Sequence, residues 1–301
     1  MKTGQASRTA EYMAFFRALE SARAPRKRLF TDSFAMQFLR PGLRRAVHFS
    51  RVPVLGALIP RYLDRRLPGA RTSGIARTRL IDDALSQALR EGIDQVLILG
   101  AGFDCRAYRL PGIGSAAVFE VDHPATLSVK RTHMHRVLAN LPHNVRFVQI
   151  DFDRQNLGEA LRQAGFDLLR PAVLLWEGVT HYLSAYAVDA VLHFVAGCAV
   201  GSRLIFTYID RRALDGSGLF EGAADLMREV ARLGEPWTFG LDPDELPNYL
   251  RGRGLQLRRD AGAREYRRQY FGRDGERMNG YDFYHVAIAS VSEASEHLPA
   301  A

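Results

Sequence analysis

From residue 95 onward, short apolar runs alternate with stretches of helical periodicity. The apolar runs are QVLILG (95–100), AAVFEVD (116–122), VRFVQID (145–151), AVLLWE (172–177) and SRLIFTYI (202–209). Helical patterns lie between and after them, near 125–138, 155–164, 184–199 and 219–232. Strands that are apolar along their whole length and separated by helices predict a parallel sheet covered on both faces.

The C-terminal part of the chain predicts a change of direction in this sheet. DPDELPNYLRGRG (242–254) predicts a helix that ends at a glycine, and two further runs follow, LQLRRD (255–260) and DFYHVAIAS (282–290). No clear helical periodicity separates these two runs, so we expect them to pair as an antiparallel edge. The predicted fold is α/β, with a doubly wound, mostly parallel, seven-stranded, Rossmann-like sheet.

The first 90 residues have a helical pattern throughout. Tyr12, Phe15, Phe16 and Leu19 recur at helical spacing within 7–20, and a long helix is expected over 72–90. Asp32 is placed to cap a helix through SFAMQFLR. We therefore divide the chain into an N-terminal helical cap (1–90), which forms a lid over the acceptor pocket, a ligand-binding core (91–292) and a tail (293–301).

Composition indicates an ordinary soluble protein. Hydrophobic residues make up 47% and charged residues 25% of the 301 residues. The longest apolar run, VPVLGALIP (52–60), is interrupted by prolines and far shorter than the roughly 18 residues of a membrane span. The N-terminus lacks the apolar stretch of a signal peptide. Two cysteines, Cys105 and Cys198, are typical of reduced thiols in the cytosol. We expect a cytoplasmic protein with no membrane partner.

The net charge of +8 raises the question of an anionic partner. The densest basic stretches, RGRGLQLRRD and REYRRQYFGRDGER, contain acidic residues as well. Neither forms a basic stripe with interleaved aromatic residues, which single-strand binders use. We therefore expect solvated surface charge and no nucleic-acid partner.

Glycines or acidic residues follow four of the predicted strands. They are Gly100, Gly102 and Asp104 after the first strand, Glu120 and Asp122 after the second, Asp151 after the third, and Glu177 and Gly178 after the fourth. Ala101 lies between the two glycines of the first turn. Ligands of open parallel sheets bind at these carboxyl ends. Glycines let a ligand approach the backbone amides, and an acid about 20 residues downstream accepts hydrogen bonds from ribose hydroxyls. The set predicts a cofactor that contains adenosine.

Two positions in the glycine turn distinguish between adenosine cofactors. A dinucleotide fingerprint requires a third glycine where this chain has Cys105. Asp104 would repel a pyrophosphate but suits an ammonium or sulfonium group, as in S-adenosylmethionine. Asp151 would lie near the adenine and Glu177 on the reaction side. An NAD-linked oxidoreductase remains the alternative.

Four motifs resemble the leucine carboxyl methyltransferase family, in particular its bacterial S-adenosylmethionine-dependent O-methyltransferases. They are SGIARTRLIDDAL, VLILGAGFDCRAYRL, VFEVDHPATLSVK and LLWEGVTHYL, and SRTAEYMAFFRALES and RLFTDSFAMQFL extend the resemblance over about residues 7–290. GAGxDxRxxRL followed by EVDHP is far narrower than a generic glycine turn. Cys105 stands where the family usually has threonine.

The resemblance implies roles for individual residues. Arg77 would contact the methionine carboxylate of the cofactor, Gly100 would line the glycine turn, and Asp122 would bind the ribose. Asp151 and Phe152 would lie beside the adenine, and Glu177 near the amino-acid end of the cofactor. Arg17 is the nearest match to a basic residue of the family's first helix that meets the acceptor.

The reaction expected is O-methylation of a small metabolite. A carboxylate acceptor needs no base, whereas a hydroxyl needs one, and His181 in EGVTHYL is the candidate, with Tyr182 beside it. A histidine in such a position more often packs against neighbouring side chains, here Tyr182 and Tyr186, than acts as a catalytic base. His123 would pack against the adenosine. The family's eukaryotic members act on a protein C-terminal carboxylate, which is a further alternative.

No metal site is expected. His133 and His135 are two positions apart in a predicted helix and would face different sides. The identity of the acceptor and the oligomeric state are not specified by the sequence.

Overall fold

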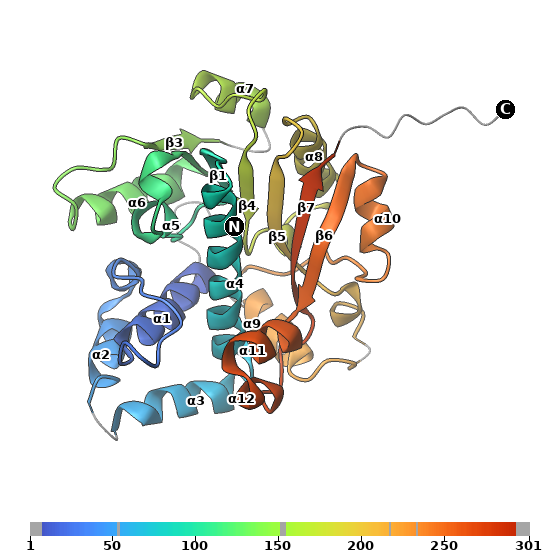
Figure 1. Cartoon of the computed structure of the whole chain (residues 1–301). Coiled ribbons are helices and arrows are strands. Elements are labelled where there is room, and N and C mark those ends of the chain that lie inside the picture. Colours follow the sequence, from blue (N-terminus) through green and yellow to red (C-terminus); the bar gives the residue numbers. More distant parts are fainter. Residues whose placement is uncertain (1–7, 53–54, 151–154, 217, 233, 293–301) are drawn as a thin grey trace.

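The structure, a computed structural model, describes residues 8–52, 55–150, 155–216, 218–232 and 234–292. Its centre is a seven-stranded sheet in the order β3-β2-β1-β4-β5-β7-β6 (Figure 1). The strands are β1 (Gln95–Leu99), β2 (Ala117–Asp122), β3 (Val145–Gln149), β4 (Val173–Trp176), β5 (Arg203–Ile209), β6 (Leu255–Gly262) and β7 (Tyr284–Val291). The first five are parallel, and β7 is antiparallel to both β5 and β6. The predicted mostly parallel α/β sheet is confirmed.

The central strands are apolar along their length because both of their faces are covered. Every residue of β1 and β4 is buried. Leu97 and Trp176 pack on one side with helices α7 (Leu157–Gln163), α8 (Ala185–Ala196) and α10 (Leu246–Arg251). Ile98 and Leu175 pack on the other with α4 (Ala70–Arg90), α5 (Arg106–Arg109) and α11 (Ala263–Phe271). This arrangement leaves the carboxyl ends of the parallel strands at one edge of the sheet.

The N-terminal residues form helices beside that edge (Figure 1). They are α1 (Arg8–Ala22), α2 (Pro41–Phe49), α3 (Leu58–Arg66) and the short 3-10 turn η1 (Ala35–Phe38), with a hydrophobic core of their own around Phe15, Phe16 and Phe38. Asp32 accepts from the backbone amides of Phe34 and Ala35, so it caps η1. Helix α4 packs with both cores through Ile75 and Leu80, so it joins the cap to the sheet.

One expectation about the C-terminal part is wrong. Two helices, α11 and α12 (Arg273–Glu276), separate β6 from β7, where we expected none. The inward face of α11 carries Ala263 and Tyr266 in the core, with Tyr270 and Phe271 packed against it and the completely buried Arg267 among them. Arg267 donates to the Ser73 hydroxyl at 3.1 Å and pairs with Asp282. The apolar residues of α11 recur at helical spacing, but Arg267, which has polar partners, interrupts the pattern on the buried face.

The remaining helices lie close to their predicted positions. They are α6 (Pro124–His135) and α9 (Ala223–Arg232), which follow β2 and β5. In the described part of the chain, no helix has the length and apolar character needed to cross a bilayer.

Candidate functional site

The turn after β1 requires glycine. Gly100 has a φ of +65°, which disfavours other residues, and a Cβ added there would lie 2.4 Å from Cγ2 of Val179. The amide of Ala101 donates to the Val121 carbonyl at 3.0 Å, which holds the turn against the end of β2. The glycine turn therefore lies between the ends of β2 and β4.

Asp122 lies directly beside this turn. Its Oδ2 accepts from the Gly102 amide at 2.7 Å and its Oδ1 from the His123 amide at 2.6 Å. The residue is half-buried, and burial raises the pKa of its carboxyl. His123 caps α6 by accepting from the Ala125 amide at 3.2 Å. Strand β2 thus brings one carboxylate to the backbone amides of the turn.

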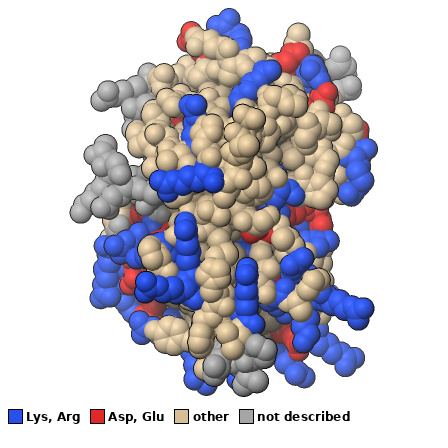
Figure 2. Space-filling model, turned by 90° about the vertical axis from the view of Figure 1, so that its left-hand side faces the viewer, with Lys and Arg blue, Asp and Glu red and all other residues tan. Residues whose placement is uncertain are grey.

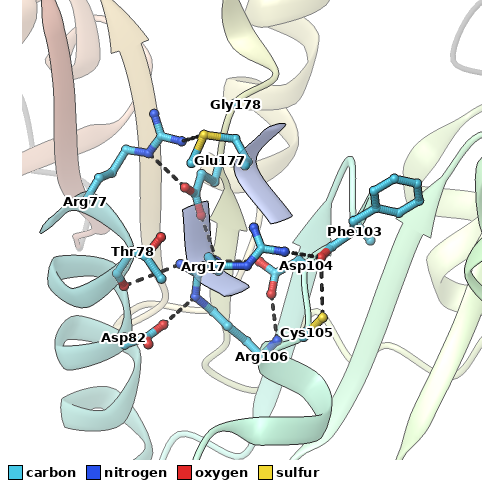
Figure 3. A network of polar contacts seen from close by, with 12 residues as sticks. Arg17, Arg77, Thr78, Asp82, Phe103, Asp104, Cys105, Arg106, Glu177 and Gly178 are labelled. Carbon is cyan, nitrogen blue, oxygen red and sulfur yellow. Dashed lines mark hydrogen bonds and ion pairs between the residues drawn. The ribbon is translucent and has the colours of Figure 1, made fainter. Parts of the chain in front are cut away.

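A buried network of charged residues connects the turn to the end of β4 (Figure 3). Arg106 donates to Asp82 and to Glu177, each at 2.7 Å, and pairs with Asp104. Burial favours the neutral form of Asp104, but the positive charges of Arg106, Lys130 and Arg17 outweigh it and lower the pKa of Asp104 to about 2. The charge of Asp104, which we expected to meet a cationic ligand, is already balanced by Arg106.

Arg77 and Glu177 extend this network; Arg77 is buried and Glu177 is half-buried. Arg77 Nε lies 2.8 Å from Glu177 Oε1, and the pKa of Glu177 is lowered because Arg106 and Arg77 together outweigh its burial. The Arg77 guanidinium lies 4.5 Å from the centre of the Tyr284 ring and contacts the sulfur of Met13 in α1. The family-derived pair is therefore assembled from α4 and β4, with the cap against it.

Gly178 follows Glu177 and borders open space. Its φ is +74°, and a Cβ built on it would meet no described atom within 4 Å. Its amide donates to the Thr207 hydroxyl at 2.8 Å. Backbone next to Glu177 is thus accessible to a ligand. Asp151 and Phe152 lie outside the described residues.

Arg17 does not point a free charge at an acceptor. Its Nε pairs with Asp32 at 2.9 Å and its Nη2 donates to the Phe103 carbonyl (Figure 3). Both contacts are buried. Arg17 therefore ties helix α1 to the glycine turn, a structural connection that the sequence did not suggest.

Glu120, which we also expected at the cofactor, lies in the interior beside the turn. It is completely buried, pairs with Lys130 at 2.9 Å and accepts from the Tyr108 hydroxyl at 3.1 Å. Lys130 also donates to the Ala101 carbonyl at 3.2 Å. Lys130 was not singled out from the sequence. Its signal is its spacing from Leu127 and Met134, which places a lysine on the buried face of α6.

His181 and Tyr182 lie in η4 (Thr180–Tyr182), directly after β4. The His181 ring is 1% exposed and packs against Tyr182, Trp237 and Tyr284 at centroid distances of 4.3, 4.4 and 5.8 Å. Burial, assisted by the positive charge of Arg77, lowers the pKa of His181 to about 3. Its Nδ1 has no hydrogen-bond partner among the described residues. His181 is a neutral imidazole within an aromatic cluster, and Trp237 and Tyr284 were missed from the sequence.

Neither metal ligation nor a disulfide is found. Among the residues with a described position, no three His, Cys, Asp or Glu side chains gather closely enough to hold a metal. The His133 ring packs 5.5 Å from that of Phe38. Cys105 and Cys198 are buried free thiols.

Comparison with known proteins identifies relatives of this chain. Residues 10–196 match the model of the leucine carboxyl methyltransferase family. A Mycolicibacterium paratuberculosis protein named "Putative S-adenosyl-L-methionine-dependent methyltransferase" is 34% identical over 259 residues, which cover 83% of this chain and 82% of the relative. A Mycobacterium avium protein of the same name is 37% identical over 206 residues, 66% of each chain.

Two solved structures share the fold. A DUF574 family protein from Streptomyces avermitilis has a TM-score of 0.59 at 16% identity, with 95% of this chain and 98% of the other covered. A Thermobifida fusca protein described as a "putative methyltransferase" has a TM-score of 0.57 at 20% identity, with coverage of 92% and 94%. At these identities the likeness concerns the fold alone.

Proposed function

Because the chain belongs to the leucine carboxyl methyltransferase family, and is therefore an S-adenosylmethionine-dependent methyltransferase, we propose that it transfers the methyl group to an oxygen atom of a small metabolite. The preferred acceptor is a carboxylate, and a hydroxyl is the second candidate. The proposed location is the cytoplasm, which agrees with two free thiols. The acceptor is recognised in a pocket formed by the N-terminal cap.

The residues at the strand ends fit S-adenosylmethionine. Its methionine part carries both a carboxylate and an ammonium group, and Arg77 and Glu177 offer a cation and an anion 2.8 Å apart. The glycine turn and Asp122 suit an adenosine ribose. When bound, the cofactor supplies a methyl group on a positively charged sulfur. Arg106 fixes Glu177 and the turn in relation to each other, so the chain orients the donor before the acceptor arrives.

The burial of His181 is the observation that carries the choice of acceptor, because the residue is 1% exposed and surrounded by aromatic rings. A hydroxyl must lose a proton during transfer, and an efficient general base has a pKa near the working pH. Burial lowers the pKa of His181 to about 3, so it is neutral but a weak base at pH 7. A carboxylate is already an anion at that pH and needs only orientation and exclusion of water. This supports a carboxylate acceptor.

The neighbours of His181 support an acceptor with an apolar or aromatic body. Tyr182, Trp237 and Tyr284 surround it within one cluster beside the Arg77–Glu177 pair. Aromatic rings offer large apolar faces with polar edges, which suits a planar acid. The proposed role of Tyr182 is to orient the acceptor and that of Trp237 is to exclude water, while the buried His181 supports the packing of both rings.

The test is a methyl-transfer screen with isotopically labelled S-adenosylmethionine over aromatic and aliphatic carboxylic acids, phenols and peptides. Base-labile methyl esters are the expected product. Stable methyl ethers would favour the hydroxyl, and transfer to nitrogen or sulfur alone would refute the proposal. Peptides ending in a free carboxylate test action on a protein C-terminus. Calorimetry with NAD tests the oxidoreductase alternative, which tight NAD binding without S-adenosylmethionine binding would support.

A further inference from the structure

The positive charge of the protein is concentrated in its first 90 residues. They contain 18 Lys and Arg against six Asp and Glu, a net charge of +12, whereas residues 91–301 carry a net charge of −4. Figure 2 shows Lys and Arg side chains gathered over the lower half of one face of the molecule. The excess charge is therefore a property of the helical cap rather than of the whole surface.

Large hydrophobic side chains are exposed on the same cap. Of nine exposed large hydrophobic residues in the described chain, four lie between 49 and 62: Phe49, Val52, Leu58 and Tyr62, which are 45%, 42%, 53% and 62% exposed. Leu58 and Tyr62 are one helical turn apart on α3. Ile59 and Leu63 of the same helix pack against the cap core. Helix α3 thus has an apolar face toward the protein and a second one toward solvent.

Exposed arginines accompany the exposed hydrophobic residues along the segment 45–66. Arg61, Arg65 and Arg66 are exposed on α3, Arg45 on α2, and Arg51 in the connection between them. In the part of the chain that the structure describes, no carboxylate lies within 4 Å of these five guanidinium groups. We call the nine residues the docking face: Arg45, Phe49, Arg51, Val52, Leu58, Arg61, Tyr62, Arg65 and Arg66.

We propose that the docking face binds the surface of a membrane that contains anionic lipids. Basic amphipathic helices lie in the plane of such a surface, with apolar side chains in the headgroup region and arginines at the lipid phosphates. The charge of the cap is complementary to an anionic leaflet. Such an association is peripheral and does not require an apolar segment long enough to span the membrane.

A membrane suits this face better than a nucleic acid does. Single strands are bound by aromatic rings on which bases stack, but two of the four exposed apolar residues, Val52 and Leu58, are aliphatic. Aliphatic side chains gain by leaving water for acyl chains. The inference does not depend on the identity of the methyl acceptor, because no docking-face residue belongs to the described ion-pair network around Arg106.

The experiment is co-sedimentation of the full chain with vesicles of pure phosphatidylcholine or of phosphatidylcholine with 30% phosphatidylglycerol, a composition of roughly the charge density of anionic membranes. We expect binding to the anionic vesicles only, weakened by salt. The triple variant Arg61→Gln, Arg65→Gln, Arg66→Gln should bind about a hundredfold more weakly. The variant Leu58→Ser, Tyr62→Ser should bind at least about tenfold more weakly.

Matched control variants distinguish vesicle binding by the docking face from a general effect of removing charged or apolar side chains. Arg162→Gln, Arg232→Gln, Arg251→Gln removes three exposed arginines outside the cap, and Leu169→Ser, Tyr186→Ser removes two residues that are 89% and 85% exposed. Both controls should bind vesicles like the unmodified chain. Calorimetry with S-adenosylmethionine checks that every variant is folded and binds its cofactor.

Three results would overturn the proposal. They are equal binding to neutral and anionic vesicles, equal losses in the controls and the docking-face variants, and no vesicle binding by a protein that binds a single-stranded oligonucleotide through the same arginines. The last result would assign the face to nucleic acid.

Discussion

The Arg106 guanidinium donates to the Glu177 carboxylate at 2.7 Å, although 71 positions separate the two residues in the chain. Arg106 opens α5 directly after the glycine turn, and Glu177 directly follows β4. The same guanidinium binds Asp82 of α4. One buried arginine therefore fixes three elements whose relative positions define the proposed cofactor site.

Replacing Arg106 should reduce the stability of the protein. Arg106→Met leaves buried carboxylates without their shared partner, and we expect the free energy of unfolding to fall by about 3–5 kcal/mol. Arg228→Met is the control, because Arg228 is 63% exposed and should change stability by less than about 1 kcal/mol. Urea unfolding of the two variants measures both changes in stability. Equal effects would mean that the buried network is energetically unimportant.

Asp122 should matter for the cofactor more than for the fold. Asp122→Asn keeps an oxygen for the Gly102 amide but loses the negative charge, so we expect S-adenosylmethionine to bind roughly ten- to a hundredfold more weakly. Asp94→Asn, at an exposed carboxylate, is the control. Calorimetry with the cofactor measures affinity and circular dichroism confirms folding. Unchanged affinity in folded Asp122→Asn would show that the ribose assignment is wrong.

Lys130 should be required for stability, because its partner Glu120 is buried. Lys130→Met leaves the Glu120 carboxylate unpaired in the interior, and we expect a loss of about 3–5 kcal/mol of stability. Adding Glu120→Gln removes the orphaned charge and should recover part of the loss. A double-mutant cycle of urea unfolding tests this. Additive effects of the two changes would contradict a direct interaction.

His181 should contribute to acid sensitivity. Its folded pKa of about 3 lies below the ordinary value near 6.5, so the unfolded chain binds the proton first and stability falls as pH drops below 6.5. Between pH 7 and pH 5 this amounts to about 2 kcal/mol. Unfolding of the unmodified protein and His181→Asn at both pH values isolates the contribution. The same pH dependence in both proteins would contradict a buried neutral imidazole.

The same substitution distinguishes the two acceptor classes. His181→Asn should reduce transfer to a carboxylate by less than about tenfold, because no proton has to be removed. Transfer to a hydroxyl should fall by about 10²-fold or more if His181 accepts its proton. Rates with one acid and one phenol from the screen, measured at saturating cofactor, give the comparison. A large loss with the carboxylate would reject the proposed role of His181.

The parallel part of the fold could be predicted because buried strands are apolar on both faces. The runs through Leu97, Phe119 and Leu174 correspond to observed strands, since most of their side chains are apolar and pack in the core. The helix around Arg267 was not recognised, because this buried arginine, whose partners Ser73 and Asp282 are distant in the sequence, interrupts the apolar pattern of its buried face. The periodicity of hydrophobic residues reveals a buried apolar face, but it does not reveal buried polar residues.

The sequence could predict that the residues of the candidate site lie at strand ends, but not which of these residues interact with one another. Gly100, Asp122 and Glu177 gather at one edge because the strands are parallel. Glu120 and Asp122 could not be distinguished by sequence, since residues two apart on a strand share a face; Glu120 lies deeper and meets Lys130. Partners such as Arg106 with Glu177 depend on the completed fold.

The position of β7 has a consequence for the order in which the protein becomes complete. Strand β7 is the last of the seven to leave the ribosome, yet it lies between β5 and β6. Its first residue, Tyr284, covers the guanidinium of Arg77. During synthesis, the sheet therefore cannot be completed, and Tyr284 cannot cover Arg77, until residues 284–291 have left the ribosome.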